Sequence, residues 1–222
     1  MRKKIIIGAI VVCIILIVGV LIGVLRQPDP DQLVSQALEN LNKANSFSYH
    51  LTQQQIVNGK ERLLTQITGY KSGDNIQIQG QLAGSNVEMI QVNNVLYNKD
   101  PFSGKWLKFS DVTIVQKVFL VELDPMATLQ LKECGEVVLK GEEVVNSKKC
   151  WVCTLKPSVQ NQLMESLWTD FEYTLFIAKS AKTIIKAEVK AINKETEEPM
   201  VLVLEFNDIG RKITIQPPGR SE

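Results

Sequence analysis

The chain has 222 residues and nearly balanced charge, with 25 Lys and Arg, 24 Asp and Glu, and a single histidine. Three basic residues lie within the first four positions, so 22 remain against 24 acidic residues in the rest of the chain. Nucleic-acid binding requires a basic stripe or patch, which the sequence lacks, and this class is excluded. We expect no metal site and no cofactor, because the lone histidine is far in sequence from three of the four cysteines and the fourth lies in an apolar run.

Residues 5–25 form an apolar run without a charge, long enough to cross a bilayer as one helix. The basic residues at positions 2–4 place the N-terminus in the cytosol by the positive-inside rule. A secretory signal has a shorter apolar core and a small-residue cleavage site, and a lipoprotein signal at Cys13 would need a smaller residue than Val12 before it. We therefore predict an uncleaved membrane anchor with an extracytoplasmic C-terminal part.

The chain divides accordingly into five parts: a cytosolic N-terminus at residues 1–4, a transmembrane helix at 5–25, a linker at 26–30, one extracytoplasmic domain at 31–217 and a tail at 218–222. The domain begins with a predicted helix. Asp29 is placed to cap it and Pro30 suits its first turn. Leu33, Ala37 and Leu41 then form one apolar stripe at helical spacing, so this helix has one buried face and ends near residue 44.

Short segments with turn residues between them follow, a pattern that predicts an antiparallel sheet made of successive hairpins. Asn58-Gly59 is the clearest of these turn signals. The alternation is lost at residues 111–132, where we expect one or two short helices, and another short helix is predicted at 158–168. From these segments we expect a sheet of about ten strands. The twelve candidate segments are 48–57, 61–70, 75–81, 87–92, 95–98, 106–109, 135–145, 149–156, 172–178, 183–192, 200–206 and 211–216.

The last strands are apolar on both faces, which is not typical of a sheet with one face in water. We infer an α+β fold in which the sheet is curved and its concave face is covered or encloses an apolar hollow. Because successive side chains of a strand point to opposite faces of the sheet, residues two or four positions apart share a face. The candidate cavity residues are Leu175 with Ile177, Ile185 with Val189, and Leu202 with Leu204.

Seven segments carry a likeness to a known family. They are 44–49 (ANSFSY), 95–99 (VLYNK), 104–106 (GKW), 141–145 (GEEVV), 149–152 (KCWV), 173–177 (YTLFI) and 206–215 (FNDIGRKITI). Through them the sequence resembles the LolA-like and LppX/LprG-like lipoprotein carrier superfamily over roughly residues 31–217. The resemblance implies an unclosed antiparallel half-barrel wrapped over two or three helices, with an apolar cavity for the acyl chains of lipids or lipoproteins. Known members are commonly periplasmic or lipid-anchored, whereas this chain has a predicted transmembrane helix.

Cys150 and Cys153 have the spacing of a redox motif, but they lie in a predicted strand, where residues three apart point to opposite faces. We predict instead a structural disulfide from Cys134 to Cys150 or Cys153, with free buried thiols as the alternative. His50 stands without a nucleophile signature. A structural role is therefore expected for His50, and we do not expect an enzyme.

Two classes of function remain. The first is a membrane-anchored binding protein that holds a lipid or acylated molecule in the half-barrel, as a carrier, chaperone or sensor. The second is an envelope interaction or sensory domain with a packed core and no lipid ligand, whose partner is an envelope protein. A dimer through Gly19 and Gly23, which have the spacing of a helix-packing motif, belongs to this second class.

Overall fold

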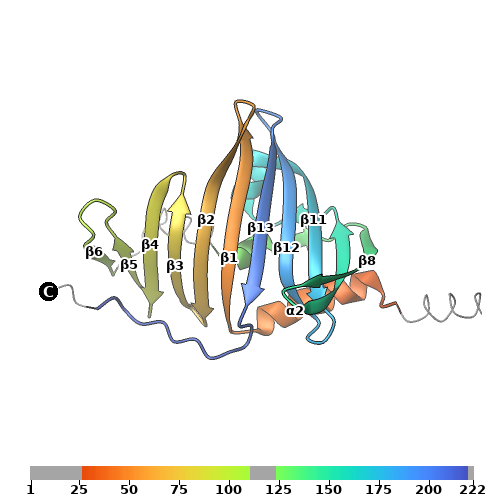
Figure 1. The fold of residues 1–222 in the computed structure, drawn as a ribbon, viewed down its shortest axis with the longest axis horizontal. Coiled ribbons are helices and arrows are strands. Elements are labelled where there is room, and N and C mark those ends of the chain that lie inside the picture. Colours follow the sequence, from red (N-terminus) through yellow and green to blue (C-terminus); the bar gives the residue numbers. More distant parts are fainter. Residues whose placement is uncertain (1–26, 111–123, 220–222) are drawn as a thin grey trace, which may run out of the picture.

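A computed structural model of the chain describes residues 27–110 and 124–219 (Figure 1). The predicted transmembrane segment at residues 5–25 and most of the predicted helical stretch at 111–132 lie outside these residues. Among the helices within the described ranges, none has the length and apolar character needed to cross a bilayer.

The first described helix, α2 (Pro30–Lys43), begins and ends where the sequence predicts. The carboxylate of Asp29 caps it by accepting hydrogen bonds from the backbone N–H groups of Asp31 and Gln32, at 3.0 and 3.2 Å. Its apolar stripe, made of Leu33, Val34, Ala37 and Leu41, is buried. The helix therefore contributes one face to the core and leaves the other in solvent.

Eleven strands form one antiparallel sheet within the described residues, and the sheet is open because its two edge strands, β6 and β8, do not pair (Figure 1). Hairpins connect most neighbours, while the first strand also pairs with the last, Leu51 lying opposite Leu204. The strand order is β6 (Trp106–Phe109), β5 (Val95–Lys99), β4 (Ser85–Val92), β3 (Asn75–Leu82), β2 (Lys60–Ser72), β1 (Ser46–Val57), β13 (Pro199–Asn207), β12 (Thr183–Asn193), β11 (Trp168–Ala178), β9 (Lys148–Leu155) and β8 (Val137–Val145).

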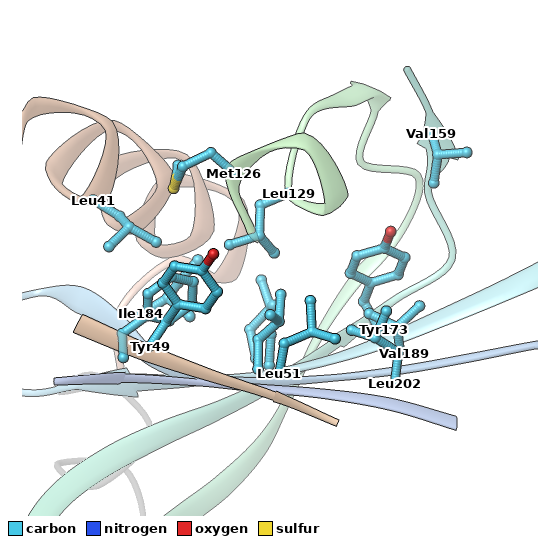
Figure 2. Packing of buried hydrophobic residues seen from close by; sticks show 14 of the residues in the cluster. Leu41, Tyr49, Leu51, Met126, Leu129, Val159, Tyr173, Ile184, Val189 and Leu202 are labelled. Carbon is cyan, nitrogen blue, oxygen red and sulfur yellow. The ribbon is translucent and has the colours of Figure 1, made fainter. Parts of the chain in front are cut away.

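Two short helices, α4 (Pro125–Thr128) and α5 (Gln162–Leu167), lie with α2 on one face of the sheet. Side chains from this layer meet side chains that rise from the sheet, as Figure 2 shows for Leu41, Met126 and Leu129 above Tyr49 and Leu51. The core is therefore a layer between the sheet and the helices. The predicted fold class, an α+β half-barrel wrapped over helices, is confirmed.

Two details differ from the prediction. Residues 211–216 are extended but form no strand. Instead, Ile213 and Ile215 pack against the outer face of the sheet, over Ile90 and Val92. In addition, a separate two-stranded sheet pairs β7 (Leu131–Glu133), which precedes β8, with β10 (Ser158–Val159), which precedes α5. The sequence did not predict this sheet, because its strands are too short to show an alternation.

Candidate ligand pocket

An apolar pocket of about 310 Å³ lies between the sheet and α5. The helix supplies Leu163, Met164 and Leu167, the first and last of which are 41% and 46% exposed. Such exposure of two leucines at a pocket leaves apolar surface available to a ligand. The other residues that line it are Leu51, Gln53, Gln55, Thr65, Leu82, Thr128, Trp168, Met200 and Leu202.

The pocket begins where the filled core ends along the β1–β13 pair. In this pair Leu51 lies opposite Leu204, and the next residues on the same face are Gln53 opposite Leu202. Leu204 is fully buried in the core cluster and is not among the pocket residues, whereas Leu202, 7% exposed and also part of that cluster, lines the pocket. On β13 the side chains that face the helices therefore change, within two residues, from fully buried core to the edge between core and pocket.

The lining is uncharged among the residues that the structure describes. Its polar groups are the amides of Gln53 and Gln55 and the hydroxyls of Thr65 and Thr128. The Thr65 hydroxyl donates a 3.3 Å hydrogen bond to Oε1 of Gln53, which fixes one amide at the wall. A ligand held here meets apolar surface and neutral hydrogen-bonding groups, an environment that suits an acyl chain and disfavours an ionic group.

Five of the six predicted cavity residues lie on the face of the sheet that meets the helices. Leu202 lines the pocket and also belongs to the core cluster. Leu175, Ile177, Val189 and Leu204 have no exposed surface and belong to the core cluster between the sheet and the helices. That these four residues contact a ligand remains a prediction.

Ile185 differs from the expectation that it shares a face with Val189. It packs on the opposite face of the sheet, in a small cluster with Phe176 and Val152. The reason is a β-bulge: Phe176 pairs with Lys186 and the next residue, Ile177, pairs with Ile184, so Ile185 is an extra residue that inverts the alternation.

Two buried tyrosines connect the sheet to the helix layer. Tyr173 rises from β11 (Figure 2) and its hydroxyl donates a 2.9 Å hydrogen bond to the carbonyl oxygen of Thr128, at the end of α4. Burial raises the pKa of Tyr173, and burial together with the charge of Asp124 raises that of Tyr49. Both phenols are therefore neutral at physiological pH and act as packing and hydrogen-bonding groups.

Cys134, Cys150 and Cys153 are free thiols in the described part of the chain. Cys150 and Cys153 belong to clusters on opposite faces of the sheet, as their spacing predicts, and Cys134 packs against the cluster that contains Cys153. Burial raises the pKa of all three thiols, that of Cys153 to about 11. A raised pKa is the reverse of what a reactive thiolate needs. Because Cys134 packs against the cluster of Cys153 and not that of Cys150, the pair to test for a disulfide is Cys134 with Cys153.

His50 lies on the outer face of β1, where its Nδ1 is 3.0 Å from the hydroxyl of Thr68. Within residues 27–110 and 124–219, no group of three His, Cys, Asp or Glu side chains is arranged to hold a metal ion. The arrangement supports binding more than catalysis, and the absence of enzymatic activity remains a prediction.

Sequence reasoning missed the α5 side of the pocket. Leu163 and Leu167 are four residues apart on a predicted helix, which is the spacing of one helical face, so the signal was present. What it could not show is that this face is only half covered. Gln53 and Gln55 alternate with the outward-facing residues of β1, and their polarity conceals the fact that they point toward the helix layer.

Comparison with known proteins supports the fold. No family model matches the sequence, and no curated protein sequence matches it. Among solved structures, LprF from Mycobacterium bovis superposes with a TM-score of 0.59 and 13% identity, over 86% of this chain and 98% of that chain. The lipoprotein LppX from Mycobacterium tuberculosis superposes with a TM-score of 0.59 and 9% identity, over 85% of this chain and all of that one.

These likenesses establish the class of architecture. The chain has the open half-barrel fold that LprF and LppX share, and this is the fold that the sequence resemblance implied.

Proposed function

We propose that this protein is a membrane-anchored, extracytoplasmic binding protein that holds a lipid or acylated molecule in the pocket between the sheet and α5. Residues 5–25 anchor it in the cell membrane as a single-pass helix, with residues 1–4 in the cytosol and the domain at 31–217 outside. It acts as a tethered carrier, chaperone or sensor rather than as an enzyme.

The observation that carries this proposal is the pocket with half-exposed leucines on one wall. Burying Leu163 and Leu167 against an acyl chain removes apolar surface from water on both partners, which favours binding by about 25 cal/mol for each Å² removed. The pocket volume is at the lower end of the range that small-molecule sites occupy. That LppX is a lipoprotein of the same fold is consistent with a role in the cell envelope.

The uncharged lining supports a finer expectation about the ligand. An acyl chain that enters with an ester, amide or hydroxyl group can hydrogen-bond to Gln53 or Gln55, whereas a free carboxylate would lose its hydration without gaining a cationic partner. We therefore expect a monoacylglycerol to bind more tightly than the fatty acid of the same chain length.

Photo-crosslinking tests the proposal on the full chain in membranes that contain a monoacylglycerol with a diazirine near the end of its acyl chain. The expected result is labelling of the peptides that contain α5 and the first residues of β13, as mapped by mass spectrometry. Labelling confined to residues 5–25, or equal labelling of the outer face of the sheet, would contradict a ligand in this pocket.

A matched pair of variants sharpens the test. Leu167→Gln should reduce labelling, because Leu167 lines the pocket. Leu107→Gln replaces a leucine on β6 with almost the same exposure, 44% against 46%, outside the pocket, and should leave labelling unchanged. Both substitutions alter half-exposed side chains and should change stability by no more than about 0.5 kcal/mol.

The competing function, an envelope interaction domain with a packed core, also has an observation in its favour. Leu175, Ile177, Val189 and Leu204 are fully buried against other side chains, so much of the concave face is already filled. If the full chain shows no labelling at α5 and self-associates, and Gly19→Ile with Gly23→Ile abolishes the association, this second function is the better account.

A further inference from the structure

A second pocket, of about 620 Å³, lies on the outer face of the sheet, opposite the helix layer. It is formed where β1 starts, β13 ends and the β11–β12 hairpin turns, at the lower end of these strands in Figure 1. Strand alternation places it outside: Tyr49 points into the core, and its neighbours Ser48 and His50 line this pocket. It is therefore separate from the pocket proposed for the acyl chain.

The floor of this outer pocket is apolar, and its edge carries donors. Ala178 and Ile185 are buried in the small outer cluster and line the pocket. Thr183, also at the floor, is only 6% exposed, and in the described part of the chain its hydroxyl has no hydrogen-bond partner. A buried hydroxyl without a partner is unfavourable, and a ligand acceptor at the floor would satisfy it.

Among the described residues, one of the two cationic side chains that line the pocket has no ion-pair partner. Asp208 is the acidic lining residue, and its two oxygens are engaged: Oδ1 by Nη1 of Arg211 at 2.9 Å and Oδ2 by the hydroxyl of Ser48 at 3.2 Å. Lys148 also lines the pocket, and no ion pair of its Nζ occurs among the residues described. The remaining N–H groups of Arg211 add further donors.

We propose that this outer pocket binds a small organic anion, a carboxylate or phosphate monoester that carries a short alkyl group. Lys148 and Arg211 supply charge-assisted hydrogen bonds to the anionic group. The hydroxyls of Ser180 and Thr183 and the ring of His50 offer further hydrogen bonds, and the alkyl group covers the apolar floor. The same anionic group could come from a free metabolite or from a lipid headgroup, and the test separates these sources.

The single histidine of the chain makes the test specific to this pocket. Full-length protein, in a non-ionic detergent and free of any histidine tag, is labelled with ¹³C at histidine Cε1, so that its one signal reports His50. At constant pH in a phosphate-free buffer, titration with butyl phosphate or butyrate should shift this signal in a saturable way. Butanol, which lacks the anion, should produce no saturable shift.

Two neighbouring lysines provide the matched variants. Lys148→Gln should weaken binding of butyl phosphate by roughly tenfold or more, the usual effect of losing a hydrogen bond to a charged group. Lys149→Gln removes the same charge at an exposed position outside the pocket and should leave the affinity within about twofold of the original. Melting temperatures of the ligand-free variants close to that of the original protein show that both are folded.

Mixed micelles with dihexanoyl phosphatidic acid or dihexanoyl phosphatidylcholine identify the source of the anion. A shift with phosphatidic acid but not with butyl phosphate or butyrate assigns the pocket to a lipid headgroup, and a shift with either small anion assigns it to a soluble one. The proposal is overturned if no anion gives a saturable shift, if butanol binds as tightly as butyl phosphate, or if the two lysine variants lose affinity equally.

Discussion

Replacing Leu202 or Leu204 by tryptophan tests whether each residue faces a ligand pocket or a packed core. The two residues are two positions apart on β13. Leu204 has no exposed surface and belongs to the core cluster, so an indole ring at this position should overpack the core. Overpacking of this kind costs about 1–3 kcal/mol. At roughly 2–4 °C for each kcal/mol in a domain of this size, Leu204→Trp should lower the melting temperature by about 2–12 °C.

Leu202→Trp should behave differently, because Leu202 faces the 310 Å³ pocket. The ring enters that space, so the melting temperature should fall by less than about 2 °C, equivalent to under 1 kcal/mol. An acyl chain that loses the burial of about two methylenes, at about 0.8 kcal/mol each, should bind roughly tenfold more weakly.

Differential scanning calorimetry and a lipid-uptake assay on both variants provide the measurement. Leu204→Trp, once corrected for its unfolded fraction, should retain uptake. Equal losses of melting temperature in the two variants would show that the position of Leu202 is filled in solution. Unchanged uptake by Leu202→Trp would remove the pocket from the binding function.

Three further predictions concern stability. A side chain at Gly69 would collide with the ring of Tyr49 opposite it, so Gly69→Ala should cost about 1–3 kcal/mol in urea unfolding but far less in a Tyr49→Leu background; an equal cost in both would refute the contact. In reduced protein burial raises the pKa of Cys153 to about 11, so this thiol does not affect stability below about pH 9 but should reduce it by up to about 3 kcal/mol between pH 9 and 11. Cys153→Ala should remove this contribution, so that its stability falls less steeply over the same pH range than that of the original protein. In oxidising conditions a Cys134–Cys153 bond should add about 3 kcal/mol and leave Cys150 as the one free thiol of residues 27–222; alkylation of all three after unfolding without reductant would disprove this bond.

The hairpins were predictable because their turns have a local cause. Asn58 and Gly59 have φ values of 54° and 70°, and Asn93 and Asn94 have 51° and 62°. These positive values are those of the tight turn that matches the twist of paired strands, and Asn and Gly adopt them at low cost. The strands on either side of such a turn are then neighbours, so the order within each half of the sheet follows from the sequence.

The remaining features depend on contacts that alternation does not encode. The pairing of β1 with β13 brings the first and last strands together across the whole domain, and no local turn specifies it. Ile213 and Ile215 alternate like strand residues, but they pack on the outer face without joining the sheet, Ile215 buried and Ile213 partly buried. The bulge at Ile185 moves one predicted cavity residue to the opposite face, although its neighbours keep the period of a strand.

The position of the pocket follows from the lengths of the helices and strands and from where the helices lie on the sheet. The lengths can be predicted from the sequence, but the positions of the helices cannot. A strand of twelve residues such as β1 spans roughly 40 Å, whereas a helix is only about 10 Å wide. Because α2 lies across the lower ends of the strands (Figure 1), it covers a fraction of their length. Next to it, Met126 of α4 and the following Leu129 pack on the core (Figure 2). Helix α5, only six residues long, leaves the pocket open beside it. The concave face is therefore a packed core under α2 and an open pocket beside α5, and the apolar pattern of β13 is the same over both.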